Sequence, residues 1–394
     1  MTLFNEHGHD MKYNFNEQVN RRNTNSYKWN IAENELPMWV ADMDFKAAPE
    51  IIEALERKVA EHVYGYQTIP DDWYLAYQNW WKTRHQLEFD KDALIFCTGV
   101  VPAISSTVRK LTTPAEKVVI LTPVYNIFFN CIYNNGRNVL ESPLKYENGQ
   151  YDIDFDDLEQ KLSDPQATLL VFCNPHNPVG KIWDKATILR IGELCEKYHV
   201  TVLSDEIHCD LTDPGKSYVP YASVSDTCRN HSITAIAPTK TFNIAGIQTA
   251  AVMIPNPVLR HKIWRALNTD EVAEPNVFAV PAAIAAFNYG ADWLDELRQY
   301  IYENKLYIQE YIRTNLPKLR LIPSEATYLL WFDCSAYSDN SSELCDQIRA
   351  KTGLFVSKGK VYGGNGNHFF RMNIACPRDN VVDGMNRLKC ALEP

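Results

Sequence analysis

The feature that most constrains the fold is a repeated alternation of short apolar runs with amphipathic segments in the middle of this 394-residue chain. Apolar or β-branched runs with the length of a buried strand occur at 92–97, 117–121, 137–144, 167–172, 200–205, 231–237 and 248–254. A segment with apolar residues at helical spacing, 184–198, lies between two of them. Such a succession with short connections predicts an α/β protein with a mostly parallel sheet covered by helices.

The flanking regions predict further elements. We expect helices at 49–63, 71–85, 257–267, 279–289 and 291–315. From residue 319 the pattern changes to shorter strands, at 319–322, 328–332, 354–356 and 368–374, with helices at 342–351 and 380–392. This pattern is typical of a smaller α+β unit. The predicted organisation is an N-terminal arm that joins the small domain (1–48), a large domain (49–289) and a small C-terminal domain (290–394).

Composition excludes several classes of partner. The net charge of −10 argues against binding to nucleic acids or to anionic membranes. No uninterrupted apolar stretch approaches the ~18 residues of a membrane-spanning helix, and the N-terminus lacks a basic region followed by an apolar one. The ten cysteines form no Cys-x-x-Cys pair, and Cys97 and Cys173 fall inside apolar strands. We therefore expect a cytoplasmic protein in a reducing compartment.

Lys240 is the first candidate functional residue. It lies in the segment 237–246, directly after an apolar run, and Pro238, Phe242 and Ile244 surround it in the sequence. A lysine in such an apolar setting is easily deprotonated, and its neutral amine can attack an aldehyde. Taken alone, the motif favours a surface lysine on a loop.

Three more candidates follow or lie within predicted strands. Asp205 ends the run 200–205, at the carboxyl end where open α/β sheets bind ligands, and a buried carboxylate there needs a cation such as the protonated ring nitrogen of pyridoxal phosphate. Asn177, in the turn after another strand, can donate its amide to the cofactor's phenolic oxygen. Arg371, in an apolar strand, suits a substrate carboxylate. Each has a structural alternative: Asp205 could begin a helix, Asn177 could belong to a common turn, and Arg371 could form an internal ion pair. The order and spacing of the three together with Lys240 favour a single site.

Together these segments resemble the fold-type-I pyridoxal-phosphate enzymes of the class I/II aminotransferase superfamily. The motifs that resemble its cystathionine β-lyase (cysteine C–S lyase) branch are 36–45, 63–66, 173–181, 205–208 and 240–246. The resemblance extends from about Tyr13 to the C-terminal helix. It implies a large domain of the aspartate aminotransferase type, a smaller α+β domain and pyridoxal 5'-phosphate as the cofactor.

The resemblance also implies roles for further residues. The cofactor ring would lie between Tyr125 and Ile207, and His208 would contact the phenolic oxygen where many aminotransferases carry a tyrosine. Trp39 would line the substrate pocket. The phosphate would be bound by Thr239, by backbone N–H groups at the start of a helix and by a tyrosine of the neighbouring subunit of a homodimer; in this chain these are Gly99, Val100, Val101 and, from the neighbour, Tyr64.

Two positions depart from the superfamily pattern. Ala237 stands where the superfamily has a serine, and Gln248 stands where it has an arginine that binds the phosphate. The phosphate would therefore depend on Thr239, on the backbone at 99–101 and on the neighbour's Tyr64.

Two clusters also suggest a metal site, because His176 lies near Cys173 in the sequence and His208 is followed by Cys209 and Asp210. Their spacing is not that of zinc fingers, and the cofactor site already accounts for both clusters. We therefore expect no metal.

The activity implied by the resemblance is α,β-elimination. Lys240 would bind the cofactor and then remove the α-proton of a substrate whose carboxylate is held by Arg371. L-cystathionine, L-cysteine or a related S-conjugate would yield pyruvate, ammonia and a thiol, either homocysteine or hydrogen sulfide. An aminotransferase shares every step up to the carbanion and remains an alternative. A pyridoxal-phosphate-sensing regulator is a more remote one, because the short N-terminal arm leaves no room for a DNA-binding domain.

Overall fold

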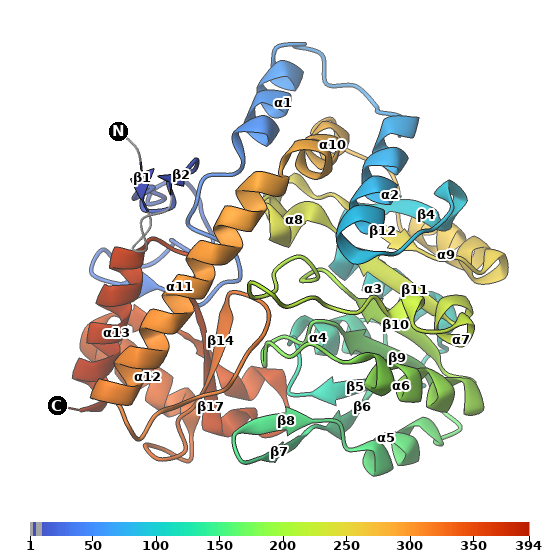
Figure 1. Ribbon diagram of the computed structural model, residues 1–394. Coiled ribbons are helices and arrows are strands. Elements are labelled where there is room, and N and C mark those ends of the chain that lie inside the picture. Colours follow the sequence, from blue (N-terminus) through green and yellow to red (C-terminus); the bar gives the residue numbers. More distant parts are fainter. Residues whose placement is uncertain (1–2, 5–9, 394) are drawn as a thin grey trace.

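The computed structural model describes residues 3–4 and 10–393. The first residues of the predicted N-terminal arm, 1–2 and 5–9, lie outside the described residues, as does residue 394. The ribbon in Figure 1 shows the described part as a large lobe built on one sheet and a smaller lobe that contains the C-terminus.

Among the described residues, the largest sheet has seven strands in the order β4-β12-β11-β10-β9-β5-β6. In chain order these strands are β4 (Leu94–Cys97), β5 (Lys117–Thr122), β6 (Asn138–Pro143), β9 (Ala167–Cys173), β10 (Thr201–Asp205), β11 (Ser232–Ile236) and β12 (Ala250–Met253). The neighbours from β11 to β6 pair in parallel, whereas β12 is antiparallel to both β11 and β4. The predicted, mostly parallel sheet is confirmed.

Helices cover both faces of this sheet. Successive residues of a strand point to opposite faces, so alternate residues of one strand pack against different helices. Val118 and Ile120 of β5 belong to the core with α3 (Val100–Leu111), α4 (Ile127–Tyr133) and α9 (Pro257–Thr269). Val119 and Leu121 belong to the core on the other face, with α5 (Phe155–Leu162), α6 (Lys185–Lys197) and α7 (Asp226–Asn230). Burial on both faces explains the nearly continuous apolar runs in the sequence.

The remaining helices of the large lobe are α1 (Pro49–Val59), α2 (Asp71–His85), α8 (Pro238–Thr241) and α10 (Ala279–Tyr289). The long helix α11 (Ala291–Asn315) runs from the large lobe to the small one (Figure 1). Its predicted range is confirmed, as are those of α2 and α10.

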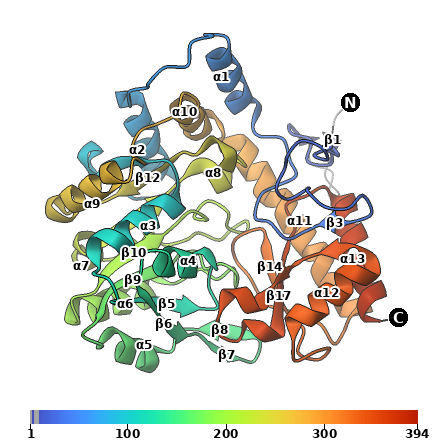
Figure 2. The same ribbon diagram turned by 180° about the vertical axis from the view of Figure 1, so that it is seen from behind.

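Within the described residues, the small lobe contains a four-stranded antiparallel sheet in the order β13-β14-β17-β16. Its elements are β13 (Arg320–Leu321), β14 (Leu329–Asp333), β16 (Ser357–Lys358) and β17 (Phe369–Asn373), with α12 (Ser341–Thr352) and α13 (Arg378–Leu392) beside them (Figure 2). Strand β3 (Leu36–Pro37) pairs with β15 (Leu354–Phe355), which brings an N-terminal segment to the small lobe. The predicted domain boundaries at 48 and 289 stay predictions.

Several predicted bounds were wrong. Helix α1 ends at Val59 rather than at residue 63, because Val59 and Val63 are exposed and do not extend its buried face. A 3₁₀ turn, Lys91–Ala93, replaces the start of the strand expected at 92–97. Strand β12 begins at Ala250, after a turn in which Gln248 is left-handed (φ 58°). Prediction missed helices α4, α5 and α7, the hairpin of β7 (Lys145–Glu147) and β8 (Gln150–Asp152), and the pair of β1 (Leu3–Phe4) and β2 (Asp10–Met11).

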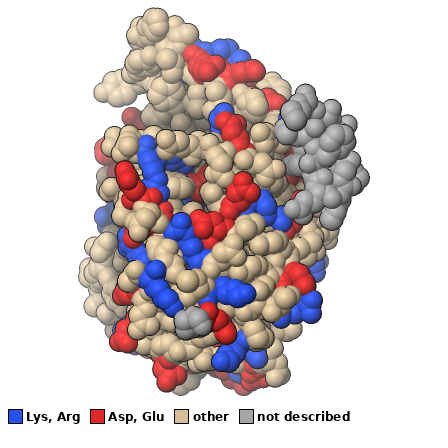
Figure 3. Space-filling view, turned by 90° about the vertical axis from the view of Figure 1, so that its left-hand side faces the viewer, with Lys and Arg blue, Asp and Glu red and all other residues tan. Residues whose placement is uncertain are grey.

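The surface carries charges of both signs. On the face drawn in Figure 3, basic and acidic side chains of the described residues are interspersed rather than gathered by sign. In the same part of the chain, none of the helices combines the length and the apolar character needed to cross a membrane.

Candidate active site

The candidate residues lie after strands that run in the same direction, so the sheet brings them to one edge. Asp205 is the last residue of β10, and its neighbours in the sheet are Cys173 of β9 and Ala235 of β11. Asn177 follows β9 and Lys240 follows β11. Ligands of open α/β sheets bind at this carboxyl edge. The register places Asp205 between the segments that carry Asn177 and Lys240.

Lys240 lies in the short helix α8, which begins with Pro238 after β11. Proline is favoured at this first helical position because its missing N–H needs no partner there. The amine of Lys240 donates a hydrogen bond to the Ala41 carbonyl. Burial, with a contribution from the positive charge of Arg371, lowers the pKa of Lys240 to about 8 against the opposing charges of Asp42 and Asp205. A substantial fraction of the amine is therefore neutral near physiological pH.

Asp205 is a buried carboxylate with few groups that could stabilise its negative charge. Its side chain accepts a hydrogen bond of 3.1 Å from the backbone N–H of Ile207, which is its only hydrogen-bond partner among the described residues. Burial raises the pKa of Asp205 to about 7, against the hydrogen bond from Ile207 and the attraction of Lys240. A cation beside this carboxylate would relieve the cost of burial and return it to the charged form.

His208 is almost fully buried, and its Nδ1 atom has no hydrogen-bond partner among the described residues. Burial lowers the pKa of His208 to about 3, and the positive charges of Lys240 and Arg371 add to this shift. The ring is therefore neutral, with one nitrogen available to a ligand. The ring of Tyr328 lies edge-on to the imidazole of His208, with 6.2 Å between the two ring centroids.

Arg371 in β17 is a buried cation without a carboxylate partner in the described part of the chain. Its Nη1 donates to Asn177 Oδ1 at 3.0 Å and its Nη2 donates to the Trp39 carbonyl at 3.1 Å. Nε has no partner among the described residues, and the guanidinium lies 5.0 Å from the centroid of the Tyr362 ring. Such a guanidinium retains both charge and hydrogen-bonding capacity for an incoming carboxylate.

Tyr125 and Ile207 lie next to this group. Tyr125 follows β5, and burial raises its pKa to about 12, while the nearby charge of Arg371 lowers it. Ile207 follows Asp205 in the turn after β10 and is half-buried. The indole of Trp39 stacks on Phe355, with ring centroids 4.6 Å apart, so its carbonyl, rather than its ring, meets Arg371.

The predicted phosphate ligands are more dispersed. Gly99 caps helix α3, whose first residues are Val100 and Val101, at the end of β4. Thr239 is buried in α8. Tyr64 is 54 % exposed; its hydroxyl donates to the Val59 carbonyl and its ring lies near Phe278, apart from the Lys240 group.

Sequence reasoning missed the residues that hold the segment 40–45 against the site. Tyr328 donates to the Ala41 carbonyl at 3.0 Å, and the same carbonyl accepts the hydrogen bond from Lys240. Asn243 donates to the carbonyls of Met43 and Phe45, and Asn373 donates to those of Val40 and Asp42. Asn373 is a polar residue in an apolar strand, but the sequence does not identify a partner more than 300 positions away.

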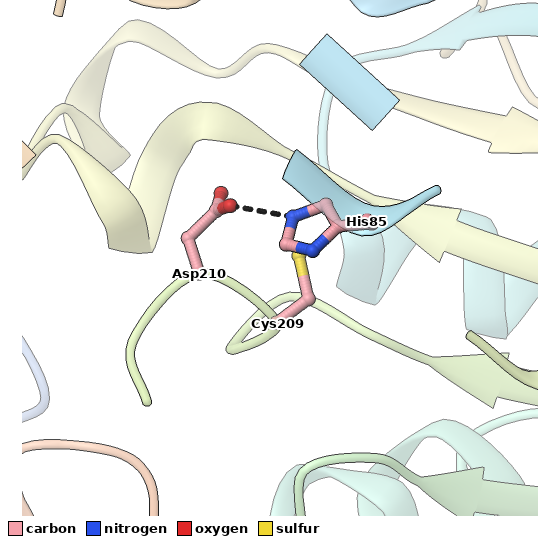
Figure 4. A group of neighbouring side chains, drawn as sticks. All are labelled: His85, Cys209 and Asp210. Atoms are coloured by element: carbon pink, nitrogen blue, oxygen red, sulfur yellow. Dashed lines mark hydrogen bonds and ion pairs between the residues drawn. The ribbon is translucent and has the colours of Figure 1, made fainter. Parts of the chain in front are cut away.

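One of the two sequence clusters that suggested a metal site contributes two residues to a spatial group with a histidine from another part of the chain. Cys209 and Asp210 lie beside His85 (Figure 4), and His208 is not a member of this group. The candidate ligand atoms of these three residues lie within 4.8 Å of one another, and His85 Nε2 is 2.7 Å from Asp210 Oδ1. The absence of a metal stays a prediction.

Comparison with known proteins places the chain in a family. The profile of the family described as aminotransferase class I and II matches residues 28–388. The chain belongs to the class I and II aminotransferase family. This result confirms the family resemblance and the fold class expected from the sequence.

Among similar members of this family is cystathionine beta-lyase PatB of Bacillus subtilis, which is 41% identical over 96% of this chain and 100% of its own length. The structure of cystalysin from Treponema denticola, which contains pyridoxal 5'-phosphate, has a TM-score of 0.94 and 33% identity; the alignment covers 97% of this chain and 99% of cystalysin. The pyridoxal-phosphate-bound C–S lyase of Staphylococcus hominis has a TM-score of 0.91 and 31% identity, over 96% and 99% of the two chains.

Proposed function

We propose that this chain is a pyridoxal-phosphate-dependent carbon–sulfur β-lyase. Its substrates would be L-cystathionine, L-cysteine or related S-conjugates, and its products pyruvate, ammonia and homocysteine, hydrogen sulfide or another thiol. The observation that carries the proposal is the meeting of Lys240, whose pKa is lowered to about 8, with the buried carboxylate of Asp205 at adjacent strand ends. The names of PatB and of the S. hominis lyase support the choice of reaction.

The residues at this edge fit pyridoxal phosphate. Asp205 has only a backbone donor among the described residues and would accept the protonated ring nitrogen. The unpartnered Nδ1 of His208 and the amide of Asn177 suit the phenolic oxygen. Tyr125 and Ile207 would contact the two faces of the ring, and Thr239 with the start of α3 would bind the phosphate.

In the proposed reaction, Arg371 binds and orients the substrate carboxylate by its guanidinium. Lys240, as a neutral amine, accepts the α-proton at Nζ and later returns a proton. Asp205 would hold the ring nitrogen of the cofactor and, as a carboxylate, would keep that nitrogen protonated. Pyridoxal phosphate, when bound, would supply an electron sink for the pair left by the α-proton, which is the chemistry that loss of a thiol from Cβ requires. The segment 40–45 covers Lys240 and limits the access of water.

We further propose a homodimer in which Tyr64 reaches the phosphate of the neighbouring subunit. Support comes from the loop after α1, where Val63 is 73% exposed, Tyr64 54% and Tyr66 100%. Large apolar side chains exposed together are typical of an interface. A cytoplasmic location is supported by the ten cysteines, all of which are free thiols. Sedimentation of the purified protein tests the dimer.

The nearest competitor is an aminotransferase, which uses the same residues up to proton removal. The test is incubation of the cofactor-loaded protein with L-cystathionine, with and without a 2-oxo acid. A lyase releases pyruvate and homocysteine continuously without the oxo acid. If product forms only when the oxo acid is present, the chain is an aminotransferase and the lyase proposal is wrong.

A further inference from the structure

A second buried carboxylate, Asp210, lies a few residues beyond Asp205. Its Oδ1 accepts a hydrogen bond of 3.0 Å from Trp80 Nε1 and lies 2.7 Å from His85 Nε2. Its Oδ2 accepts a hydrogen bond of 2.9 Å from the hydroxyl of Thr241. Trp80 and His85 belong to α2, and Thr241 belongs to α8. One carboxylate therefore joins helix α2, the turn after β10 and helix α8.

The position of Thr241 gives this contact its importance. Thr241 directly follows Lys240 in α8, a helix of only four residues with few hydrogen bonds of its own. Lys240 bonds the Ala41 carbonyl, whereas Thr241 bonds Asp210, so the two neighbouring side chains anchor α8 to different segments. The turn that contains Asp210 begins at Asp205. The Thr241 hydroxyl therefore links the segment of the lysine to the segment of its opposing carboxylate.

The two carboxylates of this turn differ in charge because their partners differ. Burial favours the neutral form of both. At Asp210, burial is outweighed by the hydrogen bond and attraction of His85, by the charge of Arg84 and by Thr241, and the pKa lies below its ordinary value. At Asp205 the available partners do not outweigh burial, and the pKa is raised. Asp210 is thus a fixed anion with three donors, and Asp205 is the carboxylate left for a ligand.

A metal ion is the competing explanation for this group, since Figure 4 shows His85 and Cys209 beside Asp210. Both oxygens of Asp210 already accept hydrogen bonds from protein groups. Burial raises the pKa of Cys209 well above its usual value, which keeps it a thiol rather than the thiolate a metal prefers. The hydrogen bonds favour a network without a metal.

We infer that His85, Asp210 and Thr241 form a positioning network that fixes Lys240 relative to Asp205. His85 and Trp80 hold the Asp210 carboxylate in place, and the carboxylate holds the Thr241 hydroxyl and with it α8. None of the three touches the cofactor or substrate in this scheme. The inference rests on the proposal that Lys240 holds the cofactor.

The test replaces Thr241 by two residues of similar size. Thr241→Val keeps the shape and removes the hydroxyl, whereas Thr241→Ser keeps the hydroxyl. Without substrate, one measures the pH midpoint of the visible absorbance of bound pyridoxal phosphate, which reports the setting of Lys240 among Asp42, Asp205 and Arg371. We expect Thr241→Val to shift this midpoint by about half a pH unit. We also expect kcat to fall about tenfold with KM nearly unchanged. Thr241→Ser should restore both quantities.

Thr107 in α3 provides the matched control. It is fully buried, and its hydroxyl has no hydrogen-bond partner among the described residues. Thr107→Val therefore makes the same substitution in the core without removing a hydrogen bond, and should leave the absorbance midpoint and kcat as in the wild type. His85→Gln retains an N–H donor toward Asp210 and should fall between wild type and His85→Leu in the same two measurements.

The outcomes are distinct. If Thr241→Val leaves the absorbance midpoint and kcat unchanged, the network does not position Lys240. If the purified protein contains one zinc ion that is lost in His85→Gln, the group is a metal site and the inference is overturned. The absorbance is read without substrate, so a failure of the lyase proposal, seen as no pyruvate from any variant, is separate from a failure of this inference.

Discussion

Arg371 Nη1 donates a hydrogen bond of 3.0 Å to Asn177 Oδ1, which joins strand β17 of the small lobe to the turn after β9 of the large one. These two residues lie 194 positions apart in the sequence. The contact holds the guanidinium near the carboxyl edge of the large sheet. Its unpartnered Nε could there donate a hydrogen bond to a ligand. The hydrogen bond therefore couples the proposed substrate carboxylate site to the proposed cofactor site.

Arg371→Lys should weaken substrate binding more than it slows turnover. A lysine keeps the charge but cannot bind a carboxylate bidentately or reach Asn177 and the Trp39 carbonyl together. We expect KM for L-cystathionine to rise by about tenfold or more, with a smaller change in kcat. Steady-state kinetics of both proteins measure this. An unchanged KM would show that the carboxylate binds elsewhere.

Asp205→Asn should have opposite effects on the cofactor-free and cofactor-loaded proteins. Since the folded pKa of Asp205 is raised to about 7, the folded state binds more protons than the unfolded state between about pH 4 and pH 7. The associated stability is present at low pH and is lost as the pH rises through this range. At pH 8 the cofactor-free variant should therefore be more stable than wild type by about 4 kcal/mol, and the difference should shrink at pH 5.

Urea unfolding of both cofactor-free proteins at the two pH values measures this effect. In the same variant, affinity for pyridoxal phosphate should fall, because asparagine cannot hold the ring nitrogen protonated. Equal free energies of unfolding at pH 8 would mean that burial does not destabilise the ionised form of Asp205.

The rate of cofactor uptake should follow the neutral fraction of Lys240. With a pKa of about 8, the rate of pyridoxal phosphate binding to the cofactor-free protein should level off above pH 8.5. An ordinary lysine would keep gaining rate up to its usual pKa of 10.5. Stopped-flow absorbance measures the uptake, and Nα-acetyl-lysine under the same conditions corrects for titration of the cofactor itself. A rate that climbs steadily to pH 10 contradicts the lowered pKa.

A buried ion pair holds the segment that covers Lys240. Lys28 is 1% exposed and donates to Asp44 Oδ2 at 2.7 Å; Asp44 also accepts hydrogen bonds from Arg21 and Trp29. Lys28→Met leaves a buried carboxylate short of one cation and should lower the free energy of unfolding by about 3 kcal/mol. Urea denaturation measures the loss.

The surface pair of Lys197 with Glu159 is the control for that substitution. Lys197→Met should leave the unfolding midpoint close to that of the wild type, because exposed pairs contribute little. Equal effects of the two substitutions would mean that the Lys28 pair does not anchor the segment.

Residues that follow buried strands could be predicted from the sequence. Asp205, Asn177 and Lys240 each come after an apolar run, and the parallel order of the strands brings their ends together. Tyr328 and Asn243 could not be predicted, because they bond backbone carbonyls of segment 40–45 about 200 to 290 positions away. Carbonyl groups are the same in every residue, so the sequence carries no signal for such contacts.

Secondary structure shows the same limit. The buried strands and the long helix α11 have strong apolar periodicity and were found. The end of α1 at Val59 was not, since the apolar residue at 63 is exposed and belongs to the proposed dimer surface. A pattern of apolar residues does not distinguish a side chain that packs within its own chain from one that would pack against a second subunit.

Covalent mapping of the cofactor tests the central claim most directly. The cofactor-loaded protein is reduced with borohydride and digested, and mass spectrometry locates the residue that carries the pyridoxyl group. The account predicts a single modified peptide with the group on Lys240, and no visible cofactor absorbance in Lys240→Ala. A pyridoxyl group on any other lysine, or a Lys240→Ala protein that still releases pyruvate from L-cystathionine, would contradict it.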